Sequence, residues 1–132
     1  MVRRAEKTVP IHRKISHLDQ MVVGVSYGVV TLGDIGEFLD AVVKARAQRY
    51  RKLFDAIEGR SGLSDTDLQM LTARLHKQPK PRPLGPFAIV ARPDREELAR
   101  VLRPFASLER PMRMFRDIHS ARRWLNHQPL TI

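Results

Sequence analysis

The chain has 132 residues, a formal net charge of +10 at pH 7 and no cysteine. It therefore fits one domain, since single domains cluster near about 100–150 residues, and disulfides, thiolate nucleophiles and zinc–thiolate sites are excluded. A cysteine-free chain favours a reducing compartment, and its charged start lacks the apolar core of a signal peptide, so we expect a cytoplasmic protein. The longest apolar stretch, Met21–Leu32, is interrupted and shorter than the roughly 20 residues of a membrane span, so no span is expected.

The first 30 residues predict two strands. In Thr8–Ile15, apolar and polar side chains alternate with the period of a half-buried strand. Pro10 predicts an edge position for this strand, because proline has no N–H to donate to a sheet. His17–Asp19 predicts a turn into a second strand, Gln20–Val30, which is rich in valine.

A helix and a third strand are predicted next. Thr31 is typical of an N-cap, and Asp34 three residues later makes a near relative of the capping box. Apolar residues at helical spacing then predict a helix that ends near Gln48. Tyr50–Ile57 predicts the third strand, and the glycine-containing run Glu58–Gly62 predicts a turn after it.

The second half of the chain continues the alternation. Ser64 predicts the N-cap of another helix, again with an acid, Asp67, at the third position. Four prolines and a glycine make Lys77–Pro86 a stiff connection. The remaining prediction is a buried strand, a helix, a short strand and a last helix, at Phe87–Ala91, Pro93–Phe105, Met112–Phe115 and Ile118–Leu125.

The predicted order is ββαβαβαβα, an α/β fold in one domain spanning residues 1–132. Repeated strand–helix units favour parallel pairing with right-handed crossovers, so we expect a mixed, mostly parallel five-stranded sheet with four helices. The two initial strands add an antiparallel hairpin. Residues 1–7 and 128–132 are expected to be flexible, and the exposed edge strand makes a homodimer reasonable.

Five segments carry a resemblance to a known family: Val22–Thr31, Arg51–Asp55, Gly85–Ala91, Met114–Asp117 and Ala121–Leu125. In their order and spacing they resemble the SpoIIAA-like branch of the STAS superfamily, the fold of anti-sigma-factor antagonists. The resemblance implies a non-enzymatic regulatory or protein-interaction domain whose partner is another protein.

The resemblance also implies a phosphorylation switch. Members of the superfamily are switched at a serine that stands where a strand hands over to a helix, and Ser61 matches that place here, with Arg60 in place of the usual small residue. Ser64 and Thr66 lie nearby, where the N-terminus of the next helix favours a phosphate. A simpler interpretation remains open, in which Ser64 only caps the helix and Ser61 only belongs to a turn.

Basic residues gather at two helix-to-strand junctions, which share one edge of a parallel sheet. Arg51 and Lys52 stand at the first junction. We expect an anion-binding basic rim on this edge, opposite Ser61, or else a merely solvated surface. Without interleaved aromatic residues, nucleic acid ranks behind phospholipid or an acidic protein as its partner. The basic rim consists of Lys44, Arg46, Arg49, Arg74, Lys77, Lys80 and Arg82.

No catalytic or metal signature appears. The five histidines show no paired metal spacing, so neither a metal site nor a cofactor is expected. Asp55 and Asp117 are expected near strand ends, where acids could share proton transfer but more commonly serve turns and caps. Two functions therefore stand beside the regulatory domain: a basic module for an anionic phospholipid or nucleic-acid surface, and a carrier of a small apolar ligand, such as a lipid, that would need a cavity.

Overall fold

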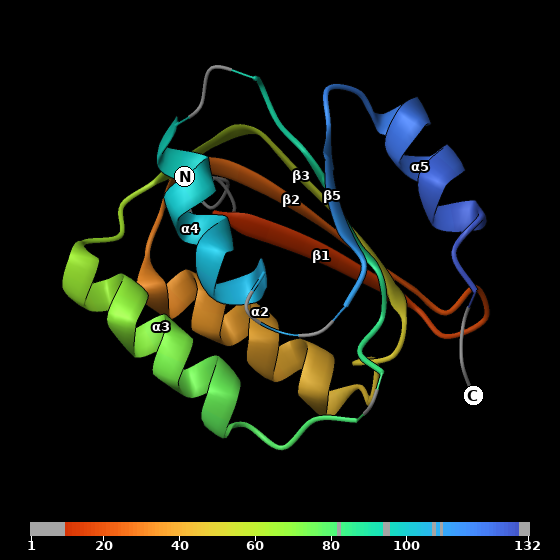
Figure 1. The fold of residues 1–132 in the computed structure, drawn as a ribbon, viewed down its shortest axis with the longest axis horizontal. Coiled ribbons are helices and arrows are strands. Elements are labelled where there is room, and N and C mark those ends of the chain that lie inside the picture. The colour runs from red at the N-terminus through yellow and green to blue at the C-terminus, as the bar shows by residue number, and fades with distance from the viewer. Residues whose placement is uncertain (1–9, 82, 94–95, 107, 109, 130–132) are drawn as a thin grey trace, which may run out of the picture.

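A five-stranded mixed sheet forms the centre of the computed structural model, which describes residues 10–81, 83–93, 96–106, 108 and 110–129 (Figure 1). The strand order is β1-β2-β3-β4-β5; β1 and β2 are antiparallel and the other neighbours are parallel. The predicted order ββαβαβαβα and the mixed sheet with four helices are confirmed. The elements are β1 (Ile11–Ser16), β2 (Met21–Val30), α2 (Leu32–Lys44), β3 (Arg51–Ser61), α3 (Asp65–Lys77), β4 (Phe87–Val90), α4 (Glu96–Ala106), β5 (Met112–Phe115) and α5 (Ile118–Asn126).

Two capping boxes start α2 and α3 where the sequence predicts them. Thr31 Oγ1 accepts a hydrogen bond from the Asp34 N–H at 3.3 Å, and Asp34 Oδ2 accepts one from the Thr31 N–H at 2.8 Å. Ser64 and Asp67 repeat the arrangement at 3.1 and 3.0 Å. Each box satisfies N–H groups that the first helical turn leaves without partners, so each fixes where the chain leaves the sheet.

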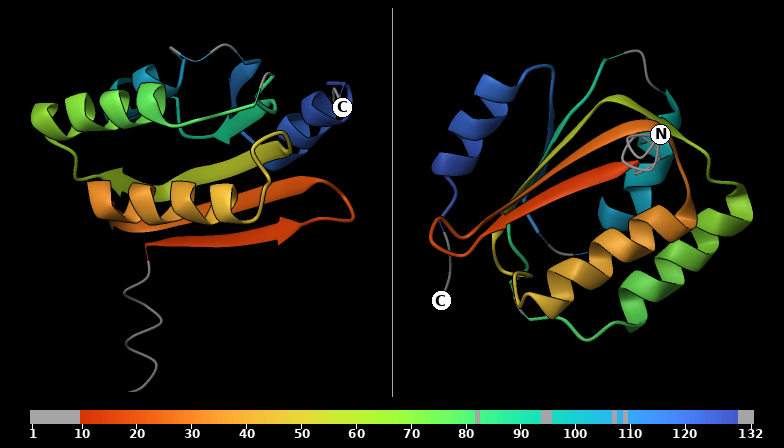
Figure 2. Two further views of the ribbon diagram at one scale, coloured as in Figure 1. Left: turned by 90° about the horizontal axis from the view of Figure 1, so that it is seen from below. Right: turned by 180° about the vertical axis from the view of Figure 1, so that it is seen from behind.

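The helices cover the two faces of the sheet unequally. Figures 1 and 2 show α2, α3 and α4 on one side and α5 on the other. The larger core lies under α2, α3 and α4 and includes Phe38, Leu71 and Ile89. A smaller core lies under α5, where Leu53 and Leu125 are fully buried.

The predicted turn at Glu58–Gly62 is wrong, because β3 continues through Ser61. Its second half pairs with β2 in parallel, after a register shift near Ser26. Gly59 is a close-packing position here and not a turn, because an added Cβ would collide with Ser26 Oγ. Glycine therefore lets the two strands approach where any side chain would push them apart.

The other differences concern boundaries. The helix expected to end near Gln48 ends at Lys44, because Arg46 adopts a φ of 57°, which helical backbone does not allow. The edge position of the first strand is confirmed, although β1 is shorter than Thr8–Ile15 and residues 8 and 9 lie outside the described part. Of the ends expected to be flexible, residues 1–7 and 130–132 are not described. Gln128 does not fit that expectation, since its carbonyl accepts a 2.7 Å hydrogen bond from Arg51 Nη2.

Candidate functional site

A cavity of about 90 Å³ lies between the sheet and helices α2 and α4. Its floor comes from β2, β3 and β4, and α4 supplies one wall through residues that recur at helical spacing. We call it the apolar cavity, because most of its lining is aliphatic or aromatic. Its lining comprises Ile11, Ser26, Val30, Ile35, Phe38, Phe54, Ala56, Gly59, Arg60, Ser61, Leu63, Phe87, Ile89, Glu97, Leu98, Val101, Leu102 and Phe105.

Polar groups gather at the solvent side of the apolar cavity. Arg60 and Glu97 are exposed and Ser61 is half-buried. The Ser61 N–H donates a 3.1 Å hydrogen bond to Glu97 Oε2, which joins the end of β3 to the first turn of α4. Because Glu97 stands on the same helix as the apolar wall, this bond helps to set the position of that wall over the sheet.

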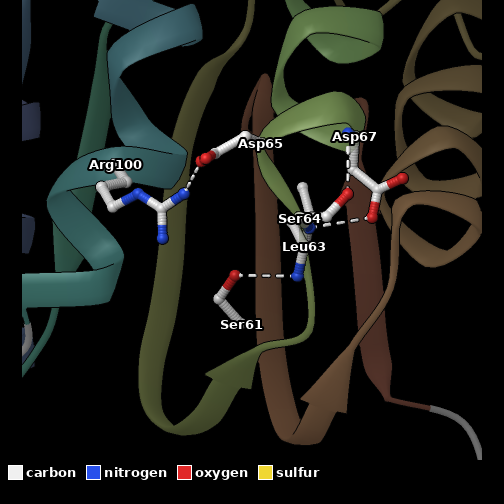
Figure 3. A network of polar contacts seen from close by, with 6 residues as sticks. All are labelled: Ser61, Leu63, Ser64, Asp65, Asp67 and Arg100. Carbon is white, nitrogen blue, oxygen red and sulfur yellow. Dashed lines mark hydrogen bonds and ion pairs between the residues drawn. The ribbon is translucent and has the colours of Figure 1, made fainter.

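Ser61 and Ser64 differ in what their hydroxyls do, as Figure 3 shows. Ser61 Oγ accepts a hydrogen bond from the Leu63 N–H at 3.2 Å, and Ser64 Oγ accepts one from the Asp67 N–H. Ser64 is therefore the N-cap of α3, whereas Ser61 lines the apolar cavity.

The electrostatics around Ser61 are mixed. Asp65 at the start of α3 forms an ion pair with Arg100 of α4, and Thr66 is exposed in the same turn. A phosphate on Ser61 would meet the favourable N-terminus of α3 but also the carboxylates of Glu97 and Asp65. Phosphorylation of Ser61 or Ser64 stays a prediction.

The basic rim lies at the opposite end of the parallel strands. Lys44, Arg74 and Lys77 line one shallow depression between α2 and α3, while Arg46 and Arg49 are exposed in the connection that follows α2. The structure thus brings residues of both junctions together.

Two members of the basic rim have partners within the chain. The guanidinium of Arg74 forms an ion pair with Asp40 and donates to the Gly36 carbonyl at 3.2 Å. The ammonium of Lys80 donates to three carbonyl oxygens near the end of α3, at 3.0 to 3.2 Å. Both side chains therefore help to hold the helices in place. Arg82 lies outside the described residues.

Two basic side chains near the basic rim are withdrawn from solvent, which was not predicted: Lys52 is buried and Arg110 is half-buried. Lys52 is 6% exposed, and its Nζ donates to the carbonyl oxygens of Gln48 at 2.7 Å and Tyr50 at 2.9 Å. Burial, and then the neighbouring charge of Arg110, lower the pKa of Lys52 to about 6. Burial likewise lowers the pKa of Arg110 to about 10, and its guanidinium lies 5.4 Å from the centroid of the Phe87 ring.

One sequence signal could have revealed Lys52. It stands two residues before Phe54 in a strand, so both side chains must share the face that α2 covers. Arg110 lies in an irregular segment before β5, where no periodicity applies.

The carboxylates of Asp55 and Asp117, which were considered for proton transfer, each accept a hydrogen bond from a backbone N–H group. Asp117 Oδ1 accepts a 2.8 Å hydrogen bond from the Ser120 N–H at the start of α5, and this bond, with that of the Ser120 hydroxyl, lowers the pKa of Asp117. Asp55 Oδ1 accepts a 3.1 Å hydrogen bond from the Ile57 N–H, and Asp55 lies inside β3 rather than near its end. The expected strand-end position is thus wrong for Asp55, because β3 is longer than predicted.

Among the described residues, no group of three or more histidine, aspartate or glutamate side chains could hold a metal ion. No helix in the described part of the chain is long and apolar enough to cross a membrane.

Comparison with solved structures identifies the fold. The chain is similar to the crystal structure of an uncharacterized protein of the DUF3478 family with a SpoIIAA-like fold from Shewanella loihica PV-4. The match has a TM-score of 0.57 and 22% sequence identity, and it covers 87% of this chain and 91% of the other. No protein-family model and no curated protein matches the sequence. The chain therefore has a SpoIIAA-like fold, as its sequence resemblance implied.

Proposed function

Because the chain has a SpoIIAA-like fold with an apolar cavity under α4, we propose that it is a non-enzymatic binding domain for a small apolar ligand. The apolar cavity is the observation that carries this proposal. Ligand sites are typically concave and apolar with a few polar groups that orient the ligand, and Ser61 and Glu97 are such groups at its solvent side.

The size of the apolar cavity restricts the ligand. At about 90 Å³ it is smaller than the roughly 150 Å³ cavity that admits benzene, so the ligand is slender or moves α4 outward. Leu98, Val101 and Leu102 of α4 are only half-buried, which makes this wall the easiest one to displace. Burial of apolar ligand surface would contribute about 25 cal/mol per Å².

A neutral probe tests this proposal directly. We expect hexanol to bind the wild-type domain in an NMR titration and to shift signals of α4 and β3 first. Val101→Trp fills the apolar cavity and should abolish binding, and Leu102→Phe should weaken it in the same direction. Met70→Trp adds an equal ring at an exposed position of α3 and should leave binding unchanged. Absence of hexanol binding to the folded wild type would refute the proposal.

A second candidate is a regulatory protein-interaction domain switched at Ser61. The hydrogen bond from the Ser61 N–H to Glu97 favours it, because a phosphate there would repel the carboxylate that anchors α4. The same event would loosen the wall of the apolar cavity and alter the surface offered to a partner.

Ser61→Asp and Glu97→Gln separate the two elements of this switch. We expect Ser61→Asp to change hexanol affinity, and we expect a smaller change from the same substitution in a Glu97→Gln background. Equal effects in both backgrounds would exclude repulsion of Glu97 as the mechanism.

A further inference from the structure

A second cavity, of about 50 Å³, lies next to the basic rim and is lined by three cationic side chains, Lys52, Lys80 and Arg110. We call it the cationic pocket. It is bounded by α2, by the end of α3 and by the segments that precede β4 and β5. No acidic side chain is among the described residues that line it.

The basic side chains of the cationic pocket have no acidic partner among the described residues that line it, and Lys52, with a pKa of about 6, becomes charged when the pH falls below 6 or when an anion binds beside it. Lys52 and Lys80 donate to backbone carbonyls, which carry no full negative charge. Arg110 Nε is buried and has no hydrogen-bond partner in the described part of the chain. Buried charges in proteins are normally paired or bind an ion, because an uncompensated one is costly. This pocket therefore has the properties of a site for an anion.

The cationic pocket shares a wall with the apolar cavity. Phe38, Phe87 and Phe105 line both hollows. Of these three rings, only that of Phe87 belongs to the sheet, whereas Phe38 stands on α2 and Phe105 on α4. A single molecule could thus place a charged end in the cationic pocket and an apolar tail in the apolar cavity.

We propose that the ligand is a small apolar carboxylic acid whose carboxylate binds Lys52 and Arg110 while its tail fills the apolar cavity. This inference rests on the function proposed above and names the class of ligand. A carboxylate fits better than a phosphate, because the planar guanidinium of Arg110 matches two carboxylate oxygens and the space is small.

The basic rim provides a route for such an anion. Val43 and Gln78 line both the cationic pocket and the depression that holds Lys44 and Lys77. The exposed cations of this depression raise the local concentration of an anion beside the cationic pocket. At low salt this increases the association rate more than the affinity.

The experiment compares hexanoate, hexanol and acetate by isothermal titration calorimetry on the whole chain at pH 5.5, where Lys52 is mostly protonated and carboxylates are mostly ionised. We expect hexanoate to bind at least about tenfold more tightly than hexanol, as a charge-assisted hydrogen bond would give. Lys52→Met and Arg110→Gln should each reduce hexanoate affinity to that of hexanol and leave hexanol affinity unchanged. Lys77→Met, an exposed neighbour in the basic rim, is the matched control and should preserve the preference for hexanoate.

The outcomes separate this inference from the proposed function. If the wild type binds hexanoate and hexanol with equal affinity, the carboxylate site is overturned and the apolar function stands. This comparison needs only the wild type, so it does not depend on whether a variant folds. A third outcome is that acetate and hexanoate bind equally well, that Lys52→Met loses both, and that hexanol does not bind. This outcome supports the anion site but overturns the apolar function and the placement of the tail in the apolar cavity. Tighter binding of inorganic phosphate than of acetate overturns the choice of carboxylate. An equal loss in Lys77→Met and Lys52→Met places the anion on the basic rim and overturns the inference.

Discussion

Replacing Lys52 with methionine should change how the stability of the domain depends on pH. The unfolded chain keeps this lysine protonated up to its ordinary pKa of 10.5, whereas the folded chain releases the proton above a pKa of about 6. Between these values the unfolded state binds about one proton more, so stability rises with pH by about 1.4 kcal/mol per pH unit. From pH 7 to 9 the contribution of Lys52 amounts to about 3 kcal/mol, and below pH 6 it no longer changes.

Urea unfolding at pH 7, 8 and 9 measures this effect. The wild type should gain stability across the series relative to Lys52→Met, which lacks the proton. Lys14→Met, in the exposed part of β1, is the control and should run parallel to the wild type. If the free energy of unfolding changes with pH equally in the wild type and in Lys52→Met, the pKa of Lys52 is not lowered. Burial then does not determine the pKa of this side chain. A bound carboxylate should flatten the wild-type curve, because it favours the charged lysine.

Three further predictions test the structure at separate places. Ser64→Ala should lower the free energy of unfolding by about 1 kcal/mol, measured in urea, because it removes the N-cap of α3. Gly59→Ala should cost roughly 1–3 kcal/mol through overpacking against Ser26, and a thermal melt should show partial recovery when Ser26→Gly is added. Wild type should bind vesicles with anionic lipid in sedimentation at low salt and release them at moderate salt, and the pair Arg49→Gln with Lys77→Gln should bind less at every salt concentration.

The elements that the sequence predicts well are those with local causes. The capping boxes at Thr31 and Ser64 need only residues three apart, and the alternation in the first strand needs only its own side chains. The end of β3 depends instead on a partner far along the chain. Gly59 is typical of a turn until Ser26 of β2 is placed against it, so local reasoning ended the strand too early.

The candidate site was less accessible to sequence reasoning than the fold. Ser61 is the last residue of β3, whereas the sequence placed it in a turn after a strand that ended at Ile57. The apolar cavity does not follow, because it is a volume left unfilled between residues from strands and helices distant in sequence. Lys52 was noted only as one basic residue among several, although its spacing to Phe54 indicates that both side chains share one face of β3.

The hydrogen bonds of Arg51 have a consequence for the order of folding. Its guanidinium donates to the carbonyl oxygens of Leu125 and Gln128, residues 74 and 77 positions further along the chain. Closing so long a loop is entropically costly and slow, so this contact belongs to the last steps. During synthesis, the sheet face that α5 covers would stay open until residues beyond Gln128 have left the ribosome. A nascent chain of this kind would expose Leu53 and Val90 to solvent or to a chaperone throughout that interval.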